Sequence, residues 1–286
     1  MMKPSLVDLT ALKQRHQKIT MITAYDAPSA RFAEIAGVDA ILIGDSAAMT
    51  VFGYDETTAI TLEEMLLLSR AVRRGAVRPL LVADMPFGSV QGSDVDMIAN
   101  AARFVKEAGV DAVKIEGAGA MVRRIQAVID AGVPVVGHIG LTPQSASQLG
   151  GYKPQGRTAS AAAGLVDDAG ALERAGCVAI VLEAIPPPVA AAITRSLTIP
   201  TIGIGAGAEC DGQVLVWHDA LGLSDRTPKF VKQYAGLGHE IVSALRTYVD
   251  DVHAGRFPDP QHTYAMPDDE RERFEKASQD LSATKS

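Results

Sequence analysis

Five polar residues each close a short apolar run along the chain: Asp45, Asp84, Glu116, His138 and Glu183. Carboxylates and histidine are the side chains that hold metal ions and move protons in enzymes. Taken singly, each has an ordinary structural explanation, such as a helix cap, an ion pair with an arginine or a satisfied position in the core. Five in succession indicate one catalytic rim.

The types of ligand indicate the metal. Asp45, Asp84 and Glu116 offer hard carboxylate oxygens, and no cysteine and only one histidine accompany them. This set favours Mg²⁺, or Mn²⁺ as its substitute, over zinc. Mg²⁺ keeps positions open for substrate oxygens, and an α-keto acid fills two of them with its carbonyl and carboxylate. We therefore expect the ion to act as a Lewis acid in the enolisation of a small α-keto acid.

Lys114 lies two residues before Glu116, so both side chains point to the same face of a strand. A buried lysine needs an anionic partner. A substrate carboxylate or a metal-bound carboxylate would serve as this partner. The alternative is a structural ion pair with Asp84, and both can hold at once.

Enolisation also needs a base near the carbon and away from the metal. Glu183 is our first choice, because it follows the apolar run 179–182, where partial desolvation favours proton uptake by a carboxylate. His138 is the alternative. It could instead hydrogen-bond the new hydroxyl group or orient Glu183.

Eight short runs rich in Val, Ile and Leu are expected to position these residues. They do not alternate with polar residues, which is typical of strands buried on both faces. The expected strands are Ile19–Ala24, Ala40–Ile43, Leu80–Ala83, Ala112–Ile115, Val133–Val136, Val178–Leu182, Thr201–Ile204 and Gln213–Trp217. Amphipathic segments lie between them, two of which begin with a capping-box pattern, at Thr61–Glu64 and Ser93–Asp96.

This repeat of strand and helix predicts an α/β fold, namely a closed (β/α)8 TIM barrel rather than an open doubly wound sheet. In such barrels the active site lies at the carboxyl ends of the strands, where the five polar residues would meet. We expect one catalytic domain over residues 1–264 and a charged tail, solvated or disordered, over 265–286. An extra leading helix (5–17) is expected to plug the barrel or contact a neighbouring subunit, and a long final helix is expected over 229–254.

Two long loops, 46–60 and 140–158, lie at the same rim and are rich in glycine and polar residues. They are candidates for a lid that excludes water from an enolate, and the alternative is that they are ordinary surface loops. The Gly203–Gly207 segment is not a nucleotide loop, because it fails the G-x-G-x-x-G pattern at Ala208. A tight backbone at the end of the seventh strand is the better interpretation.

Composition limits the possible binding partners and the cellular location of the protein. The 286 residues are 47% hydrophobic and carry a net charge of −7, which argues against nucleic acid or an anionic membrane as the main partner. Cys177 and Cys210 form no metal or disulfide pattern, and no apolar run reaches the roughly 18 residues of a membrane span. The first five residues lack the apolar stretch of a signal peptide. A cytoplasmic enzyme is expected.

Several motifs together resemble the ketopantoate hydroxymethyltransferase family over roughly residues 5 to 264. They are Gly44–Ser46, Asp84–Phe87, Val113–Gly117, Gly137–Ser145, Tyr152–Arg157, Gly203–Gly207 and Asp211–Val216. The resemblance implies transfer of a hydroxymethyl group from 5,10-methylenetetrahydrofolate to 3-methyl-2-oxobutanoate. The product would be 2-dehydropantoate, on the pathway to pantothenate.

By these motifs the resemblance also assigns roles. It implies that Asp45 and Asp84 bind Mg²⁺ and substrate, that Glu116 binds Mg²⁺, and that Ser46 and Lys114 hold the substrate. Glu183 would be the proton acceptor. The family further implies a homo-oligomer, typically a decamer. The tail beyond residue 264 matches no part of the family pattern.

Two rival interpretations are weaker. A carbon–carbon lyase or mutase of the isocitrate lyase and phosphoenolpyruvate mutase type would also bind Mg²⁺ and keto acids. The lyases generally rely on a Lys-Cys-Gly-His stretch, which this sequence lacks. A non-catalytic barrel used as a binding scaffold gives no reason for five polar residues at successive strand ends.

Overall fold

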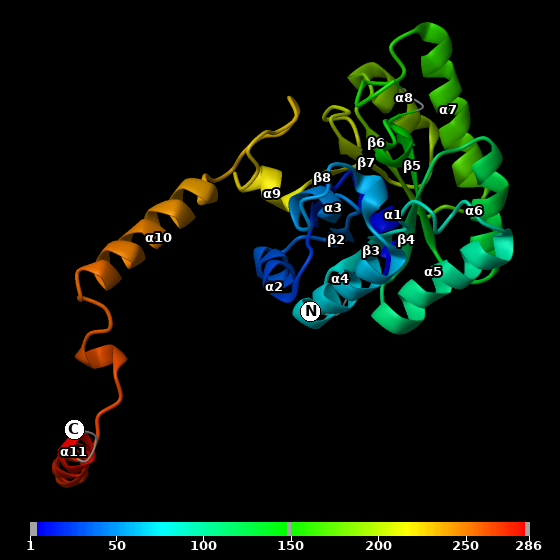
Figure 1. Ribbon diagram of the computed structural model, residues 1–286. Coiled ribbons are helices and arrows are strands. Elements are labelled where there is room, and N and C mark those ends of the chain that lie inside the picture. Colours follow the sequence, from blue (N-terminus) through cyan, green and yellow to red (C-terminus); the bar gives the residue numbers. More distant parts are fainter. Residues whose placement is uncertain (1–4, 148–149, 284–286) are drawn as a thin grey trace. The chain divides into compact units, whose positions relative to one another are not determined.

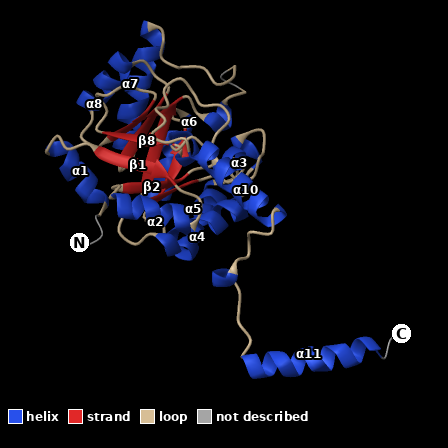
Figure 2. Ribbon diagram, turned by 90° about the vertical axis from the view of Figure 1, so that its left-hand side faces the viewer, coloured by secondary structure: helices blue, strands red, loops and turns tan. Residues whose placement is uncertain are grey.

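Eight parallel strands pair in sequence order and close into a barrel (Figures 1 and 2). The computed structural model describes residues 5–147 and 150–283. The strands are β1 (Ile19–Thr23), β2 (Ala40–Ile43), β3 (Leu80–Asp84), β4 (Ala112–Glu116), β5 (Val135–Gly140), β6 (Ala179–Glu183), β7 (Thr201–Ile204) and β8 (Gly212–Leu215). The predicted (β/α)8 TIM barrel is thus confirmed.

Helices pack around the outside of the strands, as Figure 2 shows in blue around red. They are α2 (Ala27–Ala36), α4 (Leu62–Gly75), α5 (Asp94–Ala108), α6 (Ala120–Asp130), α7 (Ala159–Arg174) and α8 (Pro187–Ser196). Both predicted capping boxes form, with the Thr61 side chain at the start of α4 and the Ser93 side chain at the start of α5. No helix separates β7 from β8, so the strand–helix repeat expected from the sequence is broken there.

The fifth strand differs from its predicted bounds. It was expected over Val133–Val136, but β5 starts after Pro134 and continues to Gly140. Pro134 has no N–H to donate. Val135–His138 pair with β4 and Val136–Gly140 pair with β6, so that His138 lies opposite Glu116 and Val181. His138 therefore lies inside its strand instead of closing it.

The barrel interior is filled by one apolar cluster, in which Leu80, Val82, Ala112, Val136 and Val181 take part. Side chains two residues apart on a strand share a face. Positions 84, 114, 116, 138 and 183 therefore continue these interior rows toward the carboxyl ends of the strands. This parity explains why the polar residues meet inside the barrel mouth.

Helix α1 (Leu6–Gln14) closes the opposite end. Leu9 is buried in the interior cluster, and Leu6 and Leu12 pack against it. The Lys13 ammonium donates to the carbonyls of Thr194 and Ile199 and lies 2.9 Å from Asp211 Oδ2. The leading helix is thus a plug, one of the two roles expected from the sequence.

The chain divides into two compact units, residues 1–235 and 236–286, and the barrel is the first. The second contains α10 (Leu237–His253), the short 3-10 turn η3 (Pro260–His262) and α11 (Asp268–Ala283). The final helix thus begins eight residues later than predicted. Residues 229–236 precede it without helical structure. The proposed domain limit at residue 264 stays a prediction.

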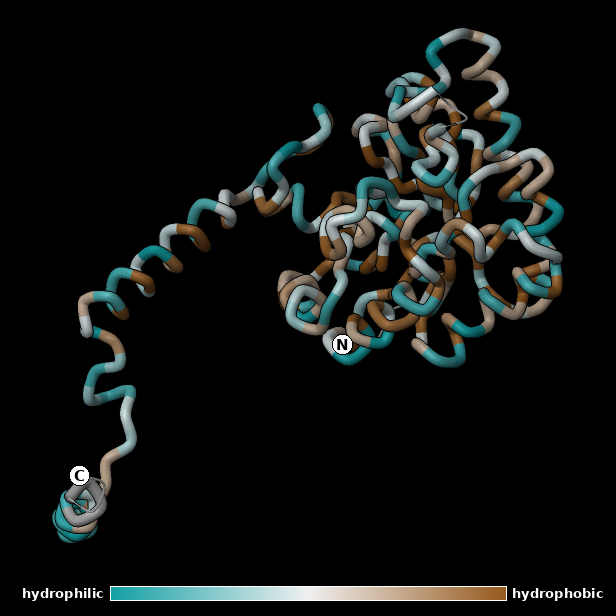
Figure 3. Tube along the Cα trace, in the orientation of Figure 1, coloured by the Kyte–Doolittle hydropathy of each residue, from teal (hydrophilic) through white to brown (hydrophobic). Residues whose placement is uncertain are grey.

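The predicted tail contains helix α11, which Figure 3 shows as mostly hydrophilic. The last residues of the predicted tail, 284–286, lie outside the described part of the chain. Residues 1–4, which belong to the N-terminal segment considered for a signal peptide, also lie outside it. Among the described residues, no helix is both long enough and apolar enough to span a bilayer.

One close helix–helix contact gives a stability prediction. A Cβ at Gly75, at the end of α4, would lie 2.2 Å from the Ala27 carbonyl oxygen of α2. We expect Gly75→Ala to lower the free energy of unfolding by about 1–3 kcal/mol, because rigid backbone cannot yield. The matched control is Gly164→Ala in α7, where a Cβ meets nothing within 4 Å, and it should stabilise by about 0.5–1 kcal/mol. Urea unfolding followed by circular dichroism measures both, and equal midpoints would contradict this packing.

Candidate active site

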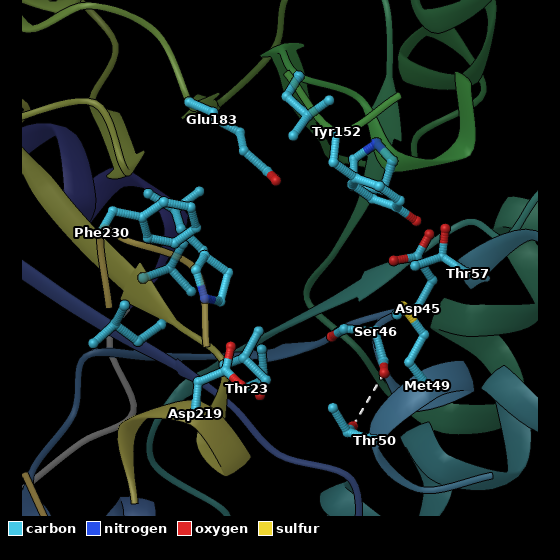
Figure 4. A pocket seen from close by; sticks show the side chains of 18 of the residues that line it. Thr23, Asp45, Ser46, Met49, Thr50, Thr57, Tyr152, Glu183, Asp219 and Phe230 are labelled. Atoms are coloured by element: carbon cyan, nitrogen blue, oxygen red, sulfur yellow. Dashed lines mark hydrogen bonds between the residues drawn. The ribbon is translucent and has the colours of Figure 1, made fainter. Parts of the chain in front are cut away.

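A cavity of about 860 Å³ opens at the carboxyl ends of the strands. Its wall contains every residue that the sequence singled out: Asp45, Ser46, Asp84, Lys114, Glu116, His138 and Glu183. The two long rim loops contribute as well, through Met49 and Thr57 from one and Tyr152 from the other (Figure 4). The structure therefore brings the predicted site together completely.

Lys114 stands at the centre of the buried charges. Its Nζ lies 3.1 Å from Asp84 Oδ1 and 3.8 Å from Glu116 Oε1, and all three side chains are almost fully buried. The same nitrogen lies 3.0 Å from His138 Nδ1. The structural ion pair between Lys114 and Asp84, considered from the sequence, is thus present. This ion pair does not exclude a contact between Lys114 and a substrate, because Lys114 also lines the cavity.

His138 connects this cluster to Glu183. Its Nδ1 lies 3.3 Å from Glu116 Oε1 and its Nε2 lies 3.3 Å from Glu183 Oε2. The Glu183 carboxylate points into the open space of the cavity (Figure 4). This geometry places His138 behind Glu183, where it can orient that carboxylate, and places Glu183 where a substrate carbon can approach.

Burial and the charge of Lys114 lower the pKa of His138, and its contacts with Glu116 and Glu183 raise it. The Lys114 ammonium lies 3.0 Å from Nδ1 and can only donate there, so Nδ1 is unprotonated in this arrangement. Nδ1 then accepts from Lys114, and Nε2 carries its proton toward Glu183.

Negative charge is in excess at this rim. Burial raises the pKa of Asp45 well above its ordinary value, and the carboxylates of Asp84 and Glu116 raise it further. Burial also raises the pKa of Asp84, against the lowering effect of Lys114. For Glu116, burial is outweighed by His138 and Lys114, which together lower its pKa. One lysine thus faces three buried carboxylates, so another cation is needed to stabilise their ionised forms.

Gln144 is a site residue that the sequence argument did not assign. Its side-chain Nε2 donates to Asp45 Oδ2 at 2.8 Å and to the Met85 carbonyl at 3.0 Å. Its backbone N–H donates to Glu116 Oε2 at 3.1 Å. Gln144 lies in the turn η2 (Pro143–Ser145), so this rim loop is tied to two of the carboxylates. A glutamine in a polar loop gave no sequence signal for this role.

Ser46 is held by a second network. Its Oγ lies 2.8 Å from the hydroxyl of Tyr25, which accepts from the hydroxyl of Thr23 at 2.9 Å. The Thr23 hydroxyl in turn accepts from the Trp217 N–H at 2.8 Å, which connects β1 to the segment after β8. Burial raises the pKa of Tyr25 to about 12, so its hydroxyl keeps its proton.

Ala184 follows Glu183 in the left-handed backbone region, with φ of 48°. Such a conformation costs about 1–3 kcal/mol for a residue other than glycine and persists only where the surroundings impose it. Here the Ala184 N–H donates to the Ile204 carbonyl, and the Ala184 carbonyl accepts from the Gln155 N–H. The turn after β6 is thus fixed by β7 and by the 140–158 loop.

The donor set fits Mg²⁺. Asp84 Oδ1 and Glu116 Oε1 are buried, hard oxygen donors that lie near Lys114 and His138 but make no hydrogen bond of good geometry. Within the described ranges, no three His, Cys, Asp or Glu side chains form a ready-made cage for an ion. Mg²⁺ commonly uses one or two carboxylates together with water and substrate oxygens, so an open site of this kind suits it better than a closed one.

The barrel resembles solved structures at low sequence identity. Phosphoenolpyruvate phosphomutase from Streptomyces platensis subsp. rosaceus matches with a TM-score of 0.61 at 18% identity, covering 99% of both chains. A phosphonopyruvate hydrolase in complex with oxalate and Mg²⁺ matches with a TM-score of 0.60 at 16% identity, covering 97% of this chain and 99% of that one. These likenesses show the fold, which the mutase and lyase rivals share.

Sequence comparison is more specific. The profile of the ketopantoate hydroxymethyltransferase family matches residues 3–260. The 3-methyl-2-oxobutanoate hydroxymethyltransferase of Oleidesulfovibrio alaskensis is 53% identical over 269 residues, covering 94% of this chain and 93% of that protein. Neither rival class accounts for a match of this extent. The chain therefore belongs to the ketopantoate hydroxymethyltransferase family of enzymes.

Proposed function

We propose that this enzyme transfers a hydroxymethyl group from 5,10-methylenetetrahydrofolate to 3-methyl-2-oxobutanoate and so forms 2-dehydropantoate for pantothenate biosynthesis. The observation that carries the proposal is the buried group of Asp45, Asp84, Glu116 and Lys114, with the carboxylate of Glu183 directed into the same cavity. An α-keto acid needs a cationic site for its two oxygens and a base for its C3 proton. Glu183 would be the base, and Lys114 together with a metal ion held by the carboxylates would form the cationic site.

Asp45, Asp84 and Glu116 would hold Mg²⁺ here. When bound, the ion supplies positive charge that stabilises the charge developing on the keto oxygen. Lys114 and the hydroxyl of Ser46 would bind the substrate carboxylate and carbonyl. Both side chains are fixed in advance, Lys114 by Asp84 and Ser46 by Tyr25, so little reorganisation is needed when the keto acid binds.

Glu183 would accept the C3 proton. The C3–H bond breaks, its electron pair forms the new bond to the one-carbon unit, and water supplies the hydroxyl oxygen as tetrahydrofolate leaves. His138 would orient Glu183, whose Oε2 lies 3.3 Å from Nε2, and Lys114 lies 3.0 Å from Nδ1 of the same ring. We assign His138 a positioning role, because its buried ring is enclosed between Lys114, Glu116 and Glu183.

The rim loops would limit access of water to the enolate. Met49, Thr57 and Tyr152 line the cavity, and Gln144 ties the 140–158 loop to the carboxylates. Residues 148 and 149 of that loop lie outside the described part of the chain. Closure of these loops over the bound keto acid stays part of the proposal.

The unpaired, buried cysteines Cys177 and Cys210 are typical of a reducing compartment, which supports a cytoplasmic location. We further propose a homo-oligomer, which the family resemblance implies to be a decamer. Within its own unit α10 has no buried residue, although Ile241, Leu245 and Tyr248 are large, exposed hydrophobic residues at helical spacing along it.

The first prediction concerns the base. Glu183→Gln should lower C3–H exchange of 3-methyl-2-oxobutanoate about 10²–10⁴-fold, because the amide cannot take the proton. Keto acid binding in the presence of Mg²⁺ should stay within about threefold. NMR in D₂O measures the exchange and calorimetry measures the binding, with the exposed Glu209→Gln as control. Exchange at the wild-type rate would show that another group is the base.

The second prediction concerns the metal. Asp84→Asn removes one negative charge from a site with excess negative charge, so Mg²⁺ affinity should fall at least about tenfold. Titration calorimetry with the keto acid present measures this affinity. Asp225→Asn is the matched control, because Asp225 lines the same cavity but is exposed. An unchanged affinity in the Asp84 variant would remove this residue from the metal site.

The third prediction concerns assembly. Light scattering after size exclusion should give a mass several times that of one chain. Leu245→Asp should lower the mass or broaden its distribution, because a charge in a buried contact is costly. Thr247→Asp lies on the other side of α10 and should leave the mass unchanged. A wild-type monomer at micromolar concentration would contradict the proposal.

A further inference from the structure

The cavity is larger than the keto acid requires. Pockets of about 300–1,000 Å³ hold drug-sized ligands, whereas 3-methyl-2-oxobutanoate has only five carbons. The residues with assigned roles occupy one part of the wall of this 860 Å³ space. Another part is formed by residues 214–230, after and including β8, which have no role in holding Mg²⁺ or the keto acid.

The two parts of the wall lie on different sides of the cavity. In Figure 4, Asp45 and Ser46 lie on one side and Phe230 and Asp219 on the other. The carboxylate of Glu183 points into the space between them. A second reactant bound against Phe230 and Asp219 would therefore approach the carbon from which Glu183 takes the proton.

His218 is part of this second wall. Its Nδ1 is buried and has no hydrogen-bond partner. Its ring lies against Tyr25, with centroids 5.5 Å apart, and the Tyr25 hydroxyl contacts Ser46. A buried ring nitrogen without a partner is costly unless a ligand or water satisfies it. The neighbouring Asp219 is held by Ser224, whose hydroxyl donates to Asp219 Oδ1 at 2.6 Å.

The glycine motif at the end of β7 positions Phe230. A Cβ at Gly205 would lie 2.7 Å from the Phe230 ring, so the ring packs directly against bare backbone. Gly205 also has φ of +65°, which other residues rarely adopt. The Gly203–Gly207 motif, which is no nucleotide loop, thus holds an aromatic face over the cavity.

Two cations complete the wall. Arg226 and Lys229 line the cavity and are exposed, whereas His218 and Asp219 are partly buried. The wall therefore offers partly buried hydrogen-bonding groups together with an exposed aromatic ring and exposed positive charge. A ligand that matches has a polar heteroaromatic ring with an anionic tail.

We propose that His218, Asp219, Phe230, Arg226 and Lys229 form the subsite for the one-carbon donor. The pterin ring packs on Phe230 and hydrogen-bonds to His218 and Asp219, and the glutamate carboxylates of the donor bind Arg226 and Lys229. The inference rests on the proposed function, because the donor is a reduced folate only if that function holds. It adds which part of the chain recognises the donor.

The test measures tetrahydrofolate binding to the full chain with Mg²⁺ and 3-methyl-2-oxobutanoate, by calorimetry under reducing conditions. Phe230→Ala and the double variant Arg226→Ala/Lys229→Ala should each raise the dissociation constant at least tenfold. The control is Lys232→Ala. Lys232 belongs to the same segment, but its ammonium lies over the Tyr234 ring and it does not line the cavity. This variant should change the dissociation constant less than twofold. C3–H exchange without donor reports separately on folding and on the keto acid site.

Weakened folate binding with exchange retained supports the subsite, and Gly205→Ala should weaken binding similarly by displacing the Phe230 ring. Wild-type affinity in both the Phe230 and the double variant overturns the subsite while leaving the proposed function intact. The double variant changes only exposed side chains, so its result does not depend on core packing. If the wild-type protein exchanges the C3 proton but binds no tetrahydrofolate, the assignment of a reduced folate as donor is wrong, and so is the proposed subsite.

Discussion

Excess negative charge buried at the mouth of the barrel is the constraint on which the rest of the site depends. Three carboxylates, from Asp45, Asp84 and Glu116, are almost completely removed from water, and one ammonium, from Lys114, lies among them. Such a group is unfavourable unless other interactions compensate for desolvation. Hydrogen bonds from Gln144 compensate in part, and a divalent cation together with an anionic substrate would complete the compensation.

The barrel makes this concentration of charge possible. Its interior rows begin with aliphatic side chains at the end closed by α1 and change to polar ones at the open end. The apolar half anchors the strands, and the parallel register brings Lys114 beside Asp84 and Glu116 beside His138. The arrangement of Asp84, Lys114, Glu116 and His138 thus follows from strand pairing, and Gln144 connects the loop after β5 to it.

Much of this was predictable from sequence because the signals were local and repeated. Asp84, Glu116 and Glu183 each end an apolar run, and the structure places each as the last residue of its strand. The spacing of two residues along a strand likewise predicted that the side chains of Lys114 and Glu116 share one face. The (β/α)8 fold followed from the count of runs, although the helix expected between β7 and β8 does not exist.

Contacts between distant segments could not be predicted in this way. Gln144 reaches Asp45 across 99 residues, and Tyr25, in the segment after β1, reaches Ser46, in the segment after β2. A glutamine or a tyrosine in such a segment does not by itself suggest this partner. His138 was assigned to the end of its strand because glycines around it conceal the pairing that β4 and β6 impose. The packing of Gly205 against Phe230 also needs coordinates, since a glycine-rich motif has several possible causes.

The proposed function requires this site to enolise 3-methyl-2-oxobutanoate and to add a one-carbon unit at the same carbon. The most direct measurement is NMR of the wild-type enzyme in D₂O with the keto acid, 5,10-methylenetetrahydrofolate and Mg²⁺, with an EDTA control. We expect loss of the C3 proton signal, appearance of a hydroxymethyl signal, and suppression of both by EDTA. Folded protein that gives neither signal change in the presence of Mg²⁺ would contradict the proposed function.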